Sequence, residues 1–303
     1  MLSRIAESMF WIGRYVERAD DQARVLTVNL ELGTEADVVS FSTELCRAMG
    51  NPVESDSISE DAWAMLGIDE QSPYSMVTAL SNCRGSARRA REILSMSTWE
   101  AINRSYRKAT SGRLALMRPP LACREVRDSC SMIIGTLAAT MPRDQAWHFL
   151  QLGRLIERMD MTARILYSTI VAPEFPAHHH IVLQACGAQQ NFVMTRGRED
   201  TLSAAVDFIL RDPLSPRSVL YCLNEALACL DDLVVDKPAR EVEDEAIRQL
   251  GQLRARIQYA PLDENFTLLD HITVDIQEAG VRATEALTAN FFEATLSSQW
   301  HER

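Results

Sequence analysis

Residues 13–26 read GRYVERADDQARVL and residues 153–166 read GRLIERMDMTARIL, so one helical pattern is written twice in this chain. Glycine, arginine, glutamate, aspartate, alanine and leucine recur in the same register at an offset of 140 residues, from position 13 to position 153. Unrelated helices commonly share an apolar period, but they rarely share a whole set of charged and glycine positions. The repeat therefore predicts two related helices and directs attention to their polar residues.

The recurring polar residues gather on one face of each predicted helix, opposite the apolar stripe, at roughly 100° per residue. Ion pairs on a solvated face contribute only about 0.2–0.5 kcal/mol each, which gives no reason to repeat the set. A glycine inside a helix costs roughly 0.5–1 kcal/mol relative to alanine, so its repetition indicates close packing. We therefore favour a charged centre facing another helix or a ligand over a solvated face. The candidate binding or structural residues are Arg14, Glu17, Arg18, Asp20, Arg24, Arg154, Glu157, Arg158, Asp160 and Arg164.

A second pair of segments repeats in the same order. Residues 72–80 read SPYSMVTAL and residues 215–223 read SPRSVLYCL, an offset of 143. Each Ser-Pro predicts the start of a helix, with a capping hydroxyl and a proline at the first helical position. Because the two pairs of segments occur in the same order, the sequence predicts two halves, residues 1–140 and 141–303, packed as one compact unit.

The expected fold class is all-α, a helical bundle built from two tandem repeats related by a pseudo-two-fold axis. No segment shows sustained two-residue alternation, which argues against strands. The expected helices cover residues 3–33, 35–50, 60–67, 73–95, 97–110, 120–140, 143–171, 180–195, 199–211, 216–235, 238–259 and 264–298. A polar loop is expected at 51–60 and an irregular turn with prolines and histidines at 172–180.

Composition limits the classes of function. A net charge of −11 disfavours nucleic acid as a partner, because such binding needs a basic face. The seven cysteines include no CxxC pair and fall mostly in apolar helical stretches, which is typical of a reduced, cytoplasmic protein with buried thiols. The N-terminus has no apolar run long enough for a signal peptide, and no stretch is long enough to cross a membrane.

The sequence contains no phosphate-binding GxxxxGK[ST] loop, no GxGxxG after a strand and no GxSxG nucleophile elbow. The missing glycine-rich loop argues against independent ATP chemistry. The strongest chemical pattern is the repeated E-x-x-D, Glu17 with Asp20 and Glu157 with Asp160, whose spacing puts both carboxylates on one helical face. Four converging carboxylates would suit Mg²⁺ or Mn²⁺. The arginines on the same helices would neutralise them, so we assign no metal and no cofactor.

Three segments carry a resemblance to a known family: GRYVERADDQARVL, ARRAREILSMSTWEAIN, and RDQAWHFLQLGRLIERMDMTARIL. Together they resemble the alpha-E family, bacterial helical proteins named for a Glu-Arg motif, and the likeness covers essentially the whole chain. The motif maps onto Glu17-Arg18 and Glu157-Arg158. The resemblance implies as partner a circularly permuted ATP-grasp protein, a carboxylate–amine ligase, accompanied by a transglutaminase-like peptidase. It implies a setting of peptide synthesis or tagging.

Three functions stay open on the sequence. The first is a helical accessory subunit of the ligase, without independent catalysis, whose charged centre binds the substrate or the partner. The second is an enzyme that uses a divalent metal or acid/base chemistry at Glu17, Asp20, Glu157 and Asp160. The third is a structural scaffold in which a buried salt-bridge seam fixes the helix arrangement.

Overall fold

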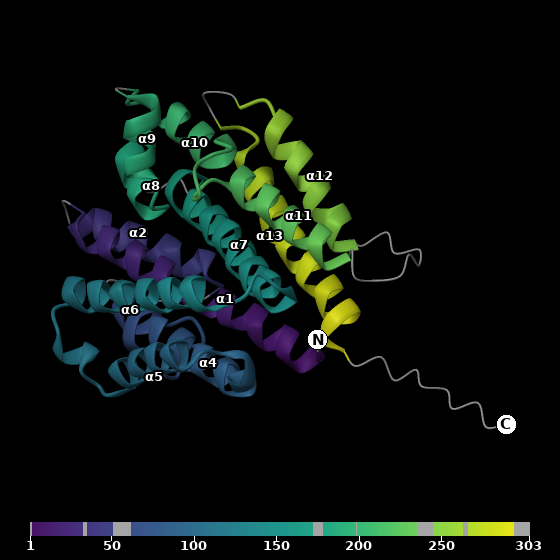
Figure 1. Ribbon diagram of the computed structural model, residues 1–303. Helices are drawn as coiled ribbons and strands as arrows, with labels where there is room; N and C mark the ends of the chain where they lie inside the picture. The colour runs from purple at the N-terminus through teal and green to yellow at the C-terminus, as the bar shows by residue number, and fades with distance from the viewer. Residues whose placement is uncertain are drawn as a thin grey trace.

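The computed structural model describes residues 2–32, 35–50, 62–171, 178–197, 199–234, 245–262 and 266–293. Every regular element in these ranges is helical, which confirms the all-α fold class (Figure 1). The α-helices are α1 (Ser3–Leu30), α2 (Glu35–Ala48), α4 (Met76–Arg89), α5 (Met96–Thr110), α6 (Pro119–Thr140), α7 (Gln145–Leu166), α8 (His179–Ala185), α9 (Gln189–Arg196), α10 (Leu202–Arg211), α11 (Val219–Val234), α12 (Glu245–Tyr259) and α13 (Leu269–Leu287).

Helices α1 and α7 form the centre of the molecule and pack against each other along their length. On one side α1 contacts α4 and α6, with α5 packed outside them. On the other side α7 contacts α11 and α13, with α12 packed outside them. Figure 1 shows the α4, α5 and α6 group and the α11, α12 and α13 group at opposite ends of the view. The two helices of the repeated sequence therefore lie where both groups meet.

The two repeated glycines mark the closest approach of α1 and α7. A Cβ added at Gly13 would fall well inside 3.0 Å of the carbonyl oxygen of Leu150, and one at Gly153 would do the same to the carbonyl oxygen of Phe10. Real Cβ atoms essentially never come so close to backbone atoms. The two helices thus cross backbone to backbone, which accounts for a glycine in each despite its cost in helix propensity.

The helices after the two Ser-Pro segments begin later than the sequence predicts, and a different serine caps each of them. Ser75 accepts a hydrogen bond from the Thr78 amide at 3.0 Å, and Ser218 accepts one from the Tyr221 amide at 3.0 Å. The second serine of each motif is therefore the cap, and the proline lies in the turn before the helix. In the second motif the residue after the proline, Arg217, lies outside the helix, and its side chain pairs with acids of α1.

Other boundaries differ in smaller ways. The helix expected over residues 180–195 is two helices, α8 and α9, separated at Gly187. Gly187 has φ of +70°, a left-handed conformation, and the Arg24 side chain packs where a Cβ would project. The loops expected at 51–60 and at 172–177, and the first residues of the helix expected over 238–259, lie outside the described residues.

All seven cysteines are buried and none forms a disulfide, as the sequence predicts. Burial raises the pKa of the Cys83, Cys186 and Cys229 thiols to about 12. At neutral pH these groups are protonated and behave as small apolar side chains. In the described part of the chain, no helix has the length and apolar character needed to span a membrane.

Candidate functional site: a charged centre between α1 and α7

Glu17 is the most deeply buried acid of the charged centre and is held mainly by arginines of α7. Its Oε1 accepts hydrogen bonds from Arg158 Nε at 2.7 Å and from Arg217 Nη1 at 3.2 Å, while Oε2 accepts from Arg154 Nε at 3.3 Å. Glu17 is 0% exposed. We call these four residues the Glu17 cluster.

Glu157 is its counterpart on α7 and is held by arginines of α1. Its Oε1 accepts from Arg18 Nε at 2.5 Å, and its Oε2 accepts from Arg14 Nε at 2.5 Å and from Arg18 Nη2 at 3.1 Å. Arg14 also donates to the Thr284 hydroxyl on α13 at 3.3 Å. We call Glu157, Arg14 and Arg18 the Glu157 cluster. The ion pairs are thus crossed, since each helix supplies the arginines for the other helix's glutamate.

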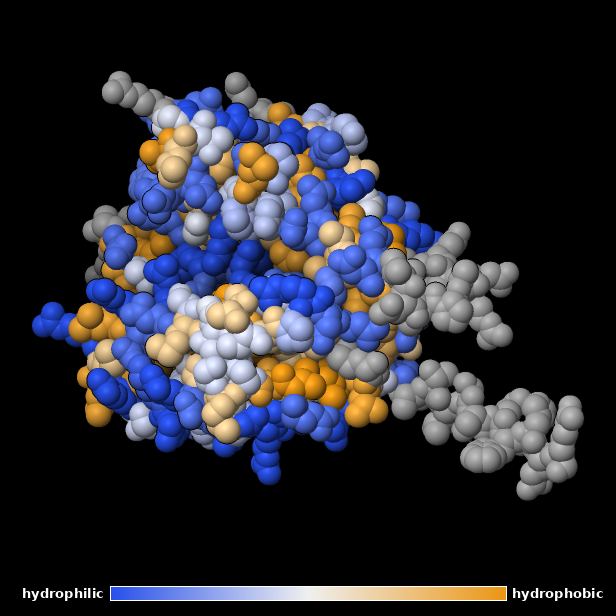
Figure 2. Space-filling view, in the orientation of Figure 1, coloured by the Kyte–Doolittle hydropathy of each residue, from blue (hydrophilic) through white to orange (hydrophobic). Residues whose placement is uncertain are grey.

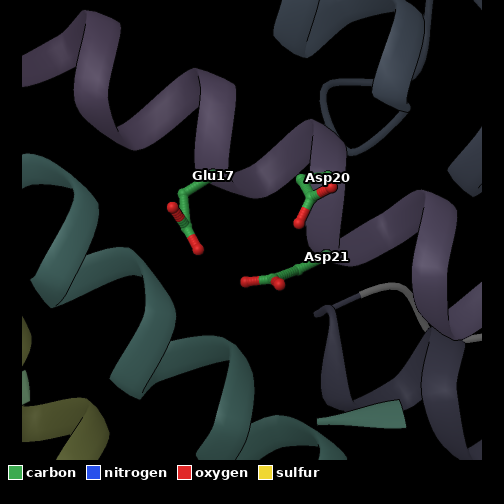
Figure 3. Close-up of side chains that lie close together, drawn as sticks. All are labelled: Glu17, Asp20 and Asp21. Atoms are coloured by element: carbon green, nitrogen blue, oxygen red, sulfur yellow. The ribbon is translucent and has the colours of Figure 1, made fainter. Parts of the chain in front are cut away.

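Three carboxylates of α1 gather beside the Glu17 cluster and point toward one another (Figure 3). Glu17, Asp20 and Asp21 each offer an oxygen within 4.8 Å of the others, and all three are buried. Arg217 donates to Asp21 at 2.7 Å and to Asp20 at 3.0 Å, and Arg24 pairs with both aspartates. The other Asp21 oxygen, Oδ2, is buried without a hydrogen-bond partner.

Asp160 and Arg164 complete the part of the centre that belongs to α7. Arg164 Nε donates to Asp160 Oδ2 at 2.9 Å, and another nitrogen of Arg164 donates to the carbonyl oxygen of Ala48 at the end of α2. This pair repeats the Asp20–Arg24 pairing of α1, without a third acid beside it. The position equivalent to Asp21 at the offset of 140 is Met161.

All ten residues singled out from the sequence lie in this centre. Two further residues belong to it that the sequence analysis did not select, Asp21 and Arg217. Neither is shared between the repeated segments, because Met161 and Tyr74 stand at the equivalent positions. With them, seven arginines face five carboxylates, so the named centre carries more positive than negative charge.

The arginines control the ionisation of the buried acids. Burial alone raises the pKa of Glu157, but the charges of Arg14 and Arg18 outweigh it and lower that pKa to about 2. Burial likewise raises the pKa of Glu17, and Arg158, Arg217 and Arg154 together bring it below its ordinary value. Both glutamates are therefore ionised over the whole neutral range.

Asp21 and Arg154 behave differently, because at each of them burial outweighs the neighbouring charges and sets the direction of the pKa shift. Burial raises the pKa of Asp21, and Arg217 and Arg24 only partly offset it. Burial lowers the pKa of the Arg154 guanidinium, and Glu17 does not fully compensate, while the nearby Arg158 adds to the lowering. A buried arginine whose charge is under-compensated is a group that an anionic ligand would stabilise.

A cavity of about 480 Å³ opens over the Glu17 cluster, between α7 and α11. Its floor includes Arg154, Arg158 and Arg217, whose partners are described above. Beyond Glu17, Arg154 donates to the Gln151 side chain at 3.2 Å and Arg158 donates to the Pro216 carbonyl at 2.7 Å. The rest of the lining is Trp147, His148, Leu155, Tyr221, Glu225, Ala228, Cys229 and Asp232. This volume lies within the range of small-molecule sites, about 300–1,000 Å³.

The Glu157 cluster is covered by aromatic side chains instead. The Arg14 guanidinium carbon lies 5.9 Å from the Trp11 ring centre, and that of Arg18 lies 5.8 Å from the Tyr15 ring centre. Trp11 and Tyr15 stack on each other at 5.4 Å. A cavity of only about 80 Å³ touches this cluster, lined in part by Arg18 and Glu157. The two clusters, each with a glutamate of one helix held by two arginines of the other, thus differ in access.

A second large cavity, of about 430 Å³, lies between α1, α6 and α8 and is lined by Arg24, Arg127, Gln184 and, again, Arg217. Figure 2 shows a hollow with hydrophilic side chains in this part of the face. Arg217 therefore borders both cavities while it pairs with the acids of α1 between them.

The sequence raised the possibility that the carboxylates of Glu17, Asp20, Glu157 and Asp160 meet at one point, and the structure shows a different group of acids. In the described part of the chain, the acids that lie at mutual metal-ligand distance are Glu17, Asp20 and Asp21, and the group includes neither Glu157 nor Asp160. Each acid of this group is already bonded by one or more arginines. Carboxylates in such pairs have little capacity left for Mg²⁺ or Mn²⁺, which require several oxygen ligands. The geometry favours ion pairing over metal binding.

Residues 1–292 match the Alpha-E family, described as a predicted alpha-helical domain with a conserved ER motif. The chain belongs to this family. It is also similar to uncharacterized proteins of Mycobacterium bovis and of two strains of Mycobacterium tuberculosis, each 24% identical over 328 aligned residues. The alignment covers 96% of this chain and 36% of each relative, so the chain spans about a third of their length. No solved structure matches it.

The crossed ion pairs give the Glu-Arg motif a physical role in this chain. Glu17 and Arg18 are neighbours in sequence, but each pairs with the opposite helix, Glu17 with Arg158 and Arg18 with Glu157. Both copies of the motif are needed for either pair to form.

Proposed function

We propose that this chain is an accessory subunit of an ATP-grasp carboxylate–amine ligase and binds a carboxylate group of the substrate at the Glu17 cluster. The observation that carries the proposal is the cavity of about 480 Å³ with Arg154 and Arg158 in its floor. Arginine holds carboxylates with two parallel hydrogen bonds, and the pair shares one internal acid, Glu17, which leaves positive charge for a ligand.

Two further observations support a role in a larger system. The chain contains no glycine-rich phosphate loop, which fits ATP chemistry that resides in a partner. Its relatives are about three times longer than the aligned region, so there the family domain is joined to further polypeptide. We place this activity in the cytoplasm, where the seven buried thiols stay reduced.

We also propose that the two halves of the chain are repeats related by a pseudo-two-fold axis. The crossed ion pairs and the reciprocal approach of Gly13 and Gly153 support it. The helix contacts support it too, because α4, α5 and α6 surround α1 in the same order as α11, α12 and α13 surround α7.

The test measures ATP hydrolysis and amide formation by a circularly permuted ATP-grasp protein, with and without this chain. We expect the two proteins to co-purify and turnover to rise. Arg154→Gln is expected to raise KM for the carboxylate substrate roughly 10- to 100-fold, the cost of losing a charged hydrogen bond.

Arg14→Gln is the matched control, since Arg14 pairs with Glu157 as Arg154 pairs with Glu17 but does not line the cavity. It should lower stability to a similar degree and leave KM unchanged. If the proteins do not associate and turnover is unaffected, the ligase role is wrong. If both variants change KM equally, the centre is a scaffold.

A further inference from the structure

The cavity over the Glu17 cluster is polarised between its floor and its rim. The floor arginines are buried: the Arg154 side chain is 16% exposed and that of Arg158 is 10% exposed. The acids that line the same cavity, Glu225 and Asp232, stand exposed on α11, two helical turns apart. Positive charge therefore lies deep in the cavity and negative charge lies at its mouth.

The rim acids are largely free to interact with a ligand. Glu225 makes no ion pair with any described residue. The ion-pair contact of Asp232 within the described residues is with His148, whose Nε2 lies 3.7 Å from Asp232 Oδ2. His148 itself lines the same cavity, beside Asp232.

This arrangement discriminates between anionic ligands. A ligand with two anionic groups would place one of them against Glu225 or Asp232, which costs energy because like charges repel. A ligand with a carboxylate at one end and an ammonium at the other meets opposite charge at both ends. Trp147 and Leu155 add apolar surface to the lining of the cavity.

We infer that the ligand of this cavity is a zwitterion, an amino acid or short peptide with both termini free. Its carboxylate lies against Arg154 and Arg158, and its ammonium lies at Glu225, with Asp232 adding negative charge to the same rim. The inference rests on the proposed function, which assigns the binding site for the carboxylate. The binding site for the ammonium group is new. It makes Glu225 and Asp232 the residues that select against N-blocked substrates.

The test is isothermal titration calorimetry of the full chain with three probes: Ala-Ala, N-acetyl-Ala-Ala and Ala-Ala-amide. We expect Ala-Ala to bind at least roughly tenfold more tightly than the N-acetyl form, a difference of about 1.4 kcal/mol. We expect the amide to bind most weakly, because it cannot pair with the floor arginines.

Glu225→Gln should abolish the preference for a free amino group while leaving the fold intact, because Glu225 is exposed. Glu278→Gln, which changes an exposed glutamate that lines a different cavity, should leave the preference unchanged. Asp232→Asn is expected to reduce the preference less than Glu225→Gln, since Asp232 already faces His148.

The outcomes separate this inference from the function beneath it. Equal binding of Ala-Ala and its N-acetyl form, with the amide weaker, overturns the zwitterion and leaves carboxylate binding in place. A preference that survives in Glu225→Gln also overturns it. If none of the three probes binds, both the zwitterion and the carboxylate site are wrong.

Discussion

The Glu17 and Glu157 clusters each join a glutamate of one central helix to two arginines of the other, yet only the Glu17 cluster borders a large cavity. Arg14 and Arg18 lie under Trp11 and Tyr15, whereas Arg154 and Arg158 face a cavity of about 480 Å³. The residues at the offset of 140 explain the contrast, because Gln151 and Leu155 stand where the first segment has Trp11 and Tyr15.

The charge on the two sides differs as well. The turn before α4 presents Tyr74 and the turn before α11 presents Arg217 at the equivalent position. The added cation meets an added acid, since Asp21 stands where the other helix has Met161. The comparison shows that one pattern of crossed ion pairs can have two roles. The Glu157 cluster is covered by aromatic rings, whereas the arginines of the Glu17 cluster form the floor of a cavity.

The largest expected effect is the loss of the glutamate at the centre of a cluster. Glu17→Gln leaves Arg154, Arg158 and Arg217 without their shared acid and should lower the free energy of unfolding by about 3–5 kcal/mol. Glu157→Gln should fall at the lower end of that range. Arg18, one of its two partners, is 24% exposed and can be hydrated. Equilibrium urea unfolding measures both.

Glu92→Gln is the control for this pair, because Glu92 and its partner Arg4 are both more than half exposed. It should change stability by at most about 1 kcal/mol. If Glu17→Gln behaves like this control, the Glu17 cluster does not hold the fold together.

The next largest loss of stability is expected where α1 and α7 approach each other most closely. Gly13→Ala and Gly153→Ala each place a methyl group against backbone of the other helix, and each should destabilise by about 1–3 kcal/mol in urea unfolding. Gly135→Ala on α6, where nothing lies within 4 Å, should instead stabilise by up to about 1 kcal/mol. Clearly unequal effects at Gly13 and Gly153 would argue against equivalent crossings.

Acid should weaken both clusters. The pKa of Glu157 in the folded chain, about 2, lies below its ordinary value of 4.5, so its stabilising contribution is fully present above pH 4.5 and is lost as pH falls toward 2. Each such group contributes at most about 1.4 kcal/mol per pH unit in that window. Urea unfolding between pH 5 and pH 2 should show a shallower pH dependence for Glu157→Gln than for the natural chain. An unchanged slope would contradict the lowered pKa.

The smallest effect concerns the aromatic cover that distinguishes the clusters. Tyr15→Leu installs the residue type found at position 155 and removes the stacking on Trp11 and the ring beside Arg18. The expected loss is about 0.5–1.5 kcal/mol in urea unfolding. Tyr259→Leu, at a site 77% exposed, should have almost no effect. A larger loss than that of Gly13→Ala would mean that the rings support the fold rather than merely cover the arginines.

Most of the helices and ten residues of the charged centre could be predicted because two signals agreed, the apolar period and the recurrence at an offset of 140. Neither signal locates a cap. Ser72 and Ser75 are both followed by apolar residues, and only the turn geometry decides that Ser75 begins α4. Gly187 follows the end of α8 in a left-handed conformation, and the side chain of Arg24, far away in sequence, occupies the space where a Cβ would project.

The recurrence also explains what the sequence did not reveal. A comparison of two segments selects what they share, and so it passes over Asp21 and Arg217, whose counterparts are Met161 and Tyr74. Of the residues that differ, Arg217, Gln151 and Leu155 line the larger cavity, and Asp21 pairs with Arg217. The shared residues therefore identify the framework, and the unshared ones identify the candidate site.

The crossed ion pairs have a consequence for how such a chain could arise. Glu17, in residues 1–140, is neutralised by Arg154 and Arg158, and Glu157, in residues 141–303, is neutralised by Arg14 and Arg18. A single half would expose an apolar helix face and a glutamate without its counter-ions, so it would be stable only beside another copy of itself. If the halves are repeats, their ancestor was a homodimer, and gene fusion then freed one copy of each paired position to diverge.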